Sequence, residues 1–171
     1  MGKSHDLATI ATDGLPTLEV DTIKNTSGTT ALTIDSAGRL LKPVLPFGQA
    51  SVSSSPISSG SKITLDLNII SGGGLTVDQT NERMIVPVAG LYAAGYHHLT
   101  DSNTNTVGIE MRKNGTLIPG SRTQTKGNTY IGLSASILIS LEVNDYIEWW
   151  SEIGIVHNNN TYNTMYLYLI G

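Results

Sequence analysis

The sequence contains no cysteine, a single phenylalanine and few charged side chains among its 171 residues. Without cysteine, disulfide bonds and thiolate metal sites are excluded, so stability must come from packing or from oligomerisation. Charged residues make up only 14% of the chain, and its polarity comes mainly from serine, threonine, asparagine and glycine. This composition favours strands and turns over helices.

The charge that is present excludes two classes of partner. The formal net charge is -4, and no run of lysine or arginine faces a nucleic-acid duplex or an anionic bilayer. No stretch approaches the roughly 20 apolar residues of a membrane span, and the first residues lack the apolar core of a signal peptide. We therefore predict no nucleic-acid partner and no membrane insertion, and we expect any extracellular role to depend on lysis or a dedicated route.

Two regions of different character follow each other along the chain. Residues 1–46 hold short apolar segments separated by turn signals such as Asp13-Gly14 and Ala37-Gly38, and strands this short cannot bury a core alone. Two prolines in residues 40–47 disfavour helix and suit a rigid extended connector. The sequence therefore predicts a β-rich N-terminal stem, residues 1–46, followed by one domain, residues 47–171.

Alternation of apolar and polar residues predicts strands in the second region. It is clearest in residues 131–141, where odd positions are apolar and most even positions are small or polar. Asn114-Gly115 is a strong hairpin signal, and Asn144-Asp145 marks another tight connection. About eight strands at short spacing, without a convincing amphipathic helix, indicate an all-β protein, either a β-sandwich or a jelly roll.

Residues that could carry catalysis or metal binding have simpler interpretations. Gly72-Gly-Gly74 lacks the Gly-Lys-Ser/Thr of a phosphate loop and is typical of a β turn. His97 and His98 are adjacent on a predicted strand and point to opposite faces, so they cannot bind one metal together within a chain. Only a threefold axis could bring three copies of one of these histidines around a metal. The acidic residues between 142 and 152 indicate a solvated strand end rather than a hydrolytic carboxylate pair. We predict no enzyme activity, no cofactor and no metal.

Four segments of the second region follow the order of a known family. Met84-Ile-Val-Pro-Val-Ala-Gly-Leu-Tyr92 matches an apolar-x-Pro-x-x-Gly-x-Tyr motif, and residues 109–115 match a strand that ends in Lys-Asn-Gly. Residues 134–147 match a Ser-rich strand and the turn after it, and residues 166–170 match a closing core strand. These segments resemble the globular heads of complement component 1q and the tumour-necrosis-factor superfamily, although the usual Gly-Asp turn and closing Phe-x-Gly are missing. The resemblance implies a jelly-roll head.

The same resemblance implies a homotrimer. In that family three sandwiches pack around a threefold axis and bury apolar or aromatic side chains between subunits. Trp149 and Trp150 are adjacent on a predicted strand and must point to opposite faces, so one enters the core and the other needs a second partner. The residues expected in the core or at the trimer interface are Tyr92, Trp149, Trp150, Tyr166 and Tyr168.

The N-terminal region carries a second resemblance. Residues 18–43, especially the stretch from Thr26 to Arg39, look like the short β stems of bacteriophage fibre and virion surface proteins. The collagen-like stalk of an animal complement protein is absent. This favours a structural protein of a bacteriophage: a capsid head fibre, a decoration protein or a short tail-fibre tip. Such a protein would be assembled in the host bacterial cytoplasm, attach through residues 1–46 to another virion protein of capsid or tail, and lie on the virion surface.

Three polar loops are expected at the end of the head remote from the N-terminus, if the family topology applies. Their candidate receptor-facing residues are Asp101, Asn103, Asn105, Arg122, Gln124, Lys126, Asn128, His157, Asn159 and Tyr162. Amide and hydroxyl groups beside Tyr162 could bind a host surface glycan or protein. The alternative interpretation is that these loop tips are polar only because they are exposed to solvent. The alternative to a trimeric bacteriophage protein is a secreted carbohydrate-binding module or bacterial adhesin, which would be monomeric.

Overall fold

The computed structural model describes residues 22–24, 26–28, 30–41, 45–52, 57–101, 106–126, 130–154, 156–157 and 161–170. This part of the chain contains strands, turns and loops only, and no helix in it could cross a membrane. The chain divides into two compact units, Met1–Pro43 and Val44–Gly171. The division falls after residue 43, whereas the sequence-based boundary falls after residue 46.

The first unit contains a small antiparallel sheet in the order β1-β2-β3. Its strands are β1 (Thr22–Lys24), β2 (Thr30–Ile34) and β3 (Leu40–Leu41). The turn between β2 and β3 is held by Asp35, whose carboxylate accepts hydrogen bonds from the backbone N–H and the Nε of Arg39 at 2.9 and 2.7 Å. Ile23 and Leu40 are exposed, and no described side chain of this sheet is buried. The sheet therefore has no core of its own among these residues.

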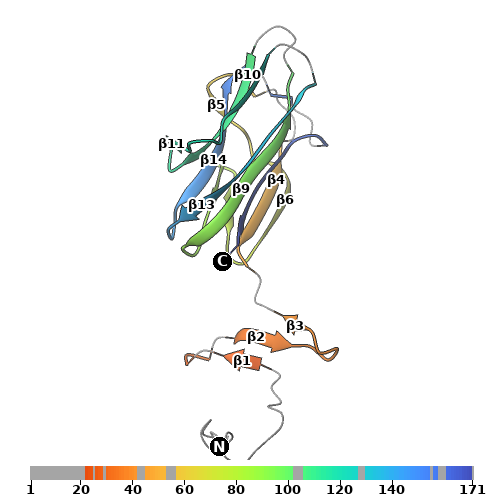
Figure 1. The fold of residues 1–171 in the computed structure, drawn as a ribbon, viewed down its shortest axis with the longest axis vertical. Helices are drawn as coiled ribbons and strands as arrows, with labels where there is room; N and C mark the ends of the chain where they lie inside the picture. The colour runs from red at the N-terminus through yellow and green to blue at the C-terminus, as the bar shows by residue number, and fades with distance from the viewer. Residues whose placement is uncertain are drawn as a thin grey trace, which may run out of the picture. The chain divides into compact units, whose positions relative to one another are not determined.

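The head is a sandwich of two antiparallel sheets (Figure 1). The first sheet has the order β13-β9-β15-β4-β6, with β13 Gly132–Leu141, β9 Gly90–Leu99, β15 Thr164–Leu169, β4 Phe47–Ser51 and β6 Leu67–Gly72. The second has the order β11-β10-β14-β8-β7, with β11 Thr116–Leu117, β10 Thr106–Lys113, β14 Tyr146–Ile153, β8 Arg83–Ile85 and β7 Thr76–Asp78. Two further strands join the second sheet, β12 (Thr123–Lys126) beside β10 and β5 (Ser61–Lys62) beside β14. Neighbouring strands come from distant parts of the chain, and the predicted all-β sandwich is confirmed.

The core lies between the two sheets and is built on the predicted alternation. Tyr92, Tyr96 and Trp149 are among its largest buried side chains, so two of the five predicted core or interface residues, Tyr92 and Trp149, belong to the core. Trp149 on β14 donates its indole N–H to the carbonyl of Gly95 on β9 at 3.1 Å. The Tyr96 hydroxyl lies 3.0 Å from the carbonyl of Ile109 on β10. Both hydrogen bonds cross from one sheet to the other and satisfy polar groups that burial would otherwise leave unpaired.

The two predicted turns form and are tied to each other. Asn114, Gly115 and Asn144 all have positive φ, at 50°, 83° and 69°, as tight turns require. The Asn114 side chain donates to Asp145 Oδ1 at 2.6 Å and accepts from the Tyr146 N–H at 2.9 Å. Although partial burial raises the pKa of Asp145, hydrogen bonds from Lys113, Asn114 and the Glu142 N–H lower it to about 2.

The outer face of the second sheet carries buried charge at Glu148, whereas Glu142, Asp145 and Glu152 keep contact with solvent, as expected of a solvated strand end. Glu148 is buried on β14 and pairs with Lys62 Nζ at 2.5 Å. Beside it, Trp150 lies under the Arg112 guanidinium, 4.0 Å from ring centroid to Cζ. Trp150 was expected to need a second partner, and it finds this partner within the same chain.

Candidate functional site

The loops predicted to face a receptor lie at one end of the head. Leu99 at the end of β9 pairs with Gly132 at the start of β13, and Thr106 at the start of β10 pairs with Lys126 at the end of β12. The ends of β9 and β12 and the starts of β10, β13 and β15 therefore lie at one end of the head, opposite the end of β15 at Leu169 (Figure 1). We call this end of the head the apex.

The predicted loop residues have different surroundings. Asn103, Asn105, Asn128 and Asn159 lie outside the described residues. Gln124 and Lys126 are exposed on β12, and Asp101 is partly exposed. Arg122 lies further from the apex, where its Nη2 pairs with Glu110 Oε2 at 2.5 Å. Among the described residues, Arg122 and Gln124 both contact Glu152, and His157 and Tyr162 lie together at the apex.

His157 and Tyr162 line an aromatic pocket at the apex. Together with Leu99 and Tyr130 they surround a cavity of about 490 Å³. The His157 ring lies between the two tyrosine rings, with centroids 5.2 Å from Tyr130 and 6.4 Å from Tyr162. Both tyrosines are largely exposed, at 62% and 48%. We call this the apical pocket, and the sequence analysis did not include two of its residues, Leu99 and Tyr130.

Buried hydrogen bonds fix the frame of the apical pocket. Asn163 is fully buried, accepts the Leu99 N–H at 2.8 Å through its Oδ1, and donates through its Nδ2 to the carbonyl of His157. The His157 N–H also donates to the Leu99 carbonyl at 2.8 Å, and the Tyr130 N–H donates to the Thr100 carbonyl at 2.9 Å. Three of the four pocket residues are thereby attached through their backbone to the end of β9.

A buried histidine lies next to this frame. His98 points into the core from β9, its ring centroid is 5.7 Å from that of Tyr96, and neither ring nitrogen has a hydrogen-bond partner among the described residues. Burial disfavours the charged imidazolium and lowers the pKa of His98 to about 3. His98 is therefore neutral in the folded head at every pH above about 4.

We expect His98 to make the head less stable in mild acid. Below its ordinary pKa of 6.5 the unfolded chain binds a proton at His98 that the folded chain does not bind until about pH 3. The free energy of unfolding should therefore fall by about 2–3 kcal/mol between pH 7.5 and 4.5 because of this group. Urea unfolding of the wild type and of His98→Leu at both pH values isolates the effect, since the variant lacks it. An equal pH dependence in the two proteins would contradict this explanation.

The outer face of the five-stranded sheet is a second candidate surface. Tyr168 pairs with Ala93, which pairs with Leu138, so an exposed tyrosine (46%) and an exposed leucine (65%) lie in one row across three strands. In the next row Tyr166 lies over Gly95, where an added Cβ would be only 2.3 Å from the tyrosine oxygen. The Tyr166 and Tyr168 rings stack with centroids 6.0 Å apart. We call this the sheet face, and it holds the two remaining predicted residues.

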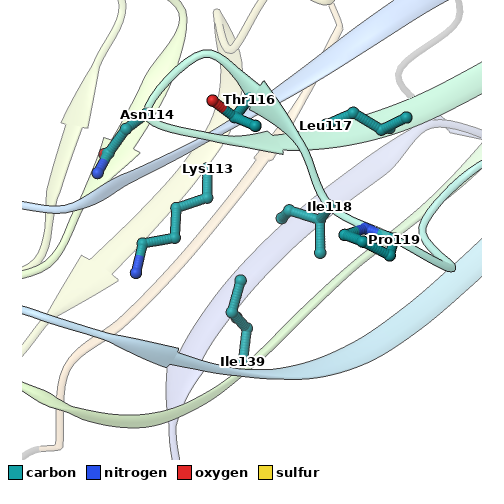
Figure 2. A pocket seen from close by; sticks show the side chains of 7 residues that line it. All are labelled: Lys113, Asn114, Thr116, Leu117, Ile118, Pro119 and Ile139. Carbon is teal, nitrogen blue, oxygen red and sulfur yellow. The ribbon is translucent and has the colours of Figure 1, made fainter.

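A groove at the edge of the sandwich is the third candidate surface. Figure 2 shows Ile118 and Pro119, which follow the β10–β11 hairpin, facing Ile139 of β13 across the groove. The cavity has a volume of about 370 Å³, and Leu117 at its border is exposed. Leu117, Ile118, Pro119 and Ile139 form the apolar part of the lining, and Lys113, Asn114 and Thr116 form the polar part, where Lys113 Nζ pairs with Asp145 Oδ2 at 2.7 Å. We call this the edge groove.

Comparisons with known proteins identify the fold. No protein-family model and no curated protein matches the chain. A crystal structure of murine APRIL at pH 5.0 matches with a TM-score of 0.61 at 13% identity, over 74% of this chain and 100% of that one. At this identity the likeness shows the fold alone. The head is a tumour-necrosis-factor-like jelly roll, as its four sequence segments predicted.

Proposed function

We propose that the protein is a non-enzymatic, homotrimeric structural protein of a bacteriophage particle, a capsid head fibre, decoration protein or short tail-fibre tip. Its N-terminal unit attaches to another virion protein, and its head is displayed on the virion surface for binding to the host. The observation that carries the proposal is the exposed apolar sheet face. The small sheet of the first unit supports it, because its exposed Ile23 and Leu40 leave it in need of a partner.

The sheet face has the character of a subunit interface. Besides Tyr168 and Leu138, the exposed apolar side chains Leu91, Ile70 and Ile170 lie on it. Exposed apolar side chains gathered on one face of a sheet are typical of protein–protein contacts. The small residues Ala93 and Gly95, on the strand beside the two tyrosines, leave room for the rings to lie flat on the sheet. A second copy of the chain is the partner that this surface suits best.

A closed trimer also needs a second, different surface, because each subunit contacts its two neighbours through different patches. The edge groove can supply it. Strand β13 contributes to both surfaces, with Leu138 on the sheet face and Ile139 in the edge groove. We therefore propose that the sheet face of one subunit packs against the edge-groove side of the next around a threefold axis.

A non-enzymatic role is supported by the state of the buried carboxylates. Glu110 is held by Arg112 and Arg122, and Glu148 by Lys62, each at 2.6 Å or less. Carboxylates fixed in ion pairs are poorly placed for proton transfer. The described residues contain no group of three or more histidines or acids that could hold a metal.

The native mass of the full chain tests the proposal. Light scattering should give three times 18.2 kDa, and the trimer should persist at nanomolar concentration because the interface is apolar. Antibodies against the head should then label intact phage particles. A strictly monomeric chain would refute the trimer and favour the monomeric carbohydrate-binding module, for which the apical pocket is the supporting observation.

A further inference from the structure

We propose that the apical pocket, lined by Leu99, Tyr130, His157 and Tyr162, binds a neutral sugar ring. The ligand class is an uncharged pyranose at the end of a surface glycan. This deepens the proposed function, since it names the chemistry by which the displayed head would recognise a host. The argument depends on the size of the cavity, the rigidity of its frame and the nature of its lining.

The size of the apical pocket suits a small ligand. Its volume of about 490 Å³ lies within the range of about 300–1,000 Å³ that small-molecule sites occupy. Two of its three rings are largely exposed, although tyrosine rings favour burial where a core is available. Exposed aromatic rings around a cavity are expected where a bound ligand packs against them.

The frame of the apical pocket is built before any ligand arrives. Leu99 and His157 are joined backbone to backbone and are both held by the buried Asn163. Tyr130 has a φ of 66°, a left-handed conformation that aromatic residues rarely adopt and that persists only when the surroundings enforce it. A preformed site loses less conformational entropy on binding, which matters most for a weakly bound ligand.

The lining of the apical pocket selects for an uncharged ring. Leucine and the faces of three aromatic rings form apolar walls, and the phenol and imidazole groups can hydrogen-bond at the rim. A pyranose has the complementary form, with C–H groups on its face and hydroxyls around its edge. No lysine, arginine, aspartate or glutamate lines the described pocket, so a phosphate or carboxylate would lose its water without gaining a counter-charge.

Binding can be measured on the full chain by saturation-transfer NMR. The probes are the methyl glycosides of glucose, galactose, mannose and N-acetylglucosamine, with a methyl sialoside as the charged comparison. At least one neutral glycoside should bind with millimolar affinity, and saturation should be strongest on the C–H protons of one ring face. Tyr162→Ala should weaken binding roughly tenfold or more, since it removes one of the stacking rings.

A second variant and a control keep the test independent of folding. Tyr130→Gly also removes a ring, at a position whose positive φ suits glycine, so binding should weaken while stability is retained. Val143→Ala, at an exposed site in the turn before β14, should leave binding unchanged. The proposal is overturned if no neutral glycoside binds, if the sialoside binds more tightly, or if both ring variants bind like the wild type.

The sugar assay and the mass measurement fail independently of each other. NMR detects each pocket by itself, so a monomeric chain that binds a neutral glycoside would refute the trimer and keep the sugar site. A trimeric chain that binds none would refute the sugar site and keep the assembly. If both hold, three apical pockets on one axis would add weak contacts through avidity on a glycan-coated surface.

Discussion

Tyr168→Glu is expected to convert the trimer into a folded monomer. Tyr168 is exposed in the single chain and lies at the centre of the sheet face, in one row with Ala93 and Leu138. In the proposed trimer, three carboxylates would be buried in an apolar interface without counter-charges. An unpaired buried charge costs about 3–5 kcal/mol, so three of them cost about 9–15 kcal/mol per trimer and should raise the concentration at which the trimer dissociates roughly 10³- to 10⁵-fold.

The matched control for this change is Val143→Glu. Val143 is exposed to a similar extent, 53% against 46%, but it lies in the turn between β13 and β14, outside both proposed contact surfaces. The two variants therefore change hydrophobicity and charge similarly at equally exposed sites. Analytical ultracentrifugation should find only the Tyr168 variant near 18.2 kDa, with an unchanged circular dichroism spectrum. A trimeric Tyr168→Glu would show that the sheet face is not the interface.

Glu110→Gln is expected to lower the stability of the head. Glu110 is only 1% exposed on the outer face of β10, and both of its carboxylate oxygens are used. Oε1 accepts from Arg112 Nε at 2.6 Å, and Oε2 accepts from Arg122 Nε at 2.9 Å. An amide of the same shape has one acceptor and would turn N–H groups toward a guanidinium. Because Arg112 and Arg122 are partly exposed and water can solvate them, the free energy of unfolding should fall by about 1–3 kcal/mol, the cost of losing charge-assisted hydrogen bonds to a buried acceptor.

Glu152→Gln provides the control for the loss at Glu110. Glu152 contacts the same Arg122, but at 3.6 Å and with a more exposed side chain. Solvent screens such a pair, so the change should cost less than about 1 kcal/mol. Urea unfolding at pH 7 compares both variants with the wild type. If Glu110→Gln costs no more than Glu152→Gln, the buried cluster does not stabilise the head as its geometry implies.

Local sequence patterns were sufficient for much of the fold. Alternation in residues 131–141 predicted β13, and Asn114-Gly115 and Asn144-Asp145 predicted turns that have the expected positive φ. These features depend on neighbours in sequence, whose geometry is set by steric limits on φ and by strand pleating. The arrangement of the two sheets was accessible only through family resemblance, because it pairs strands that lie far apart in the chain.

The candidate site could be predicted only in part. His157 and Tyr162 were identified because they lie in a polar loop, but Leu99 and Tyr130 come from two other segments and gave no comparable signal. Arg122 was assigned to a receptor-facing loop because it begins the polar segment 122–128, and its side chain is exposed but paired with Glu110. Its partner Glu110 is distant in sequence, so only the pairing of β10 with β12 shows the ion pair.

The sequence by itself determined that this protein is built of strands, that it has no disulfides or thiolate sites, and where several of its tight turns lie. Tertiary structure alone decided which strands are neighbours, which charges are paired, and which rings meet at the apex. The physical reason is that strand propensity and turn geometry are local, whereas burial and electrostatic pairing depend on which distant strands become neighbours. All three candidate surfaces for function, the apical pocket, the sheet face and the edge groove, depend on these long-range neighbours.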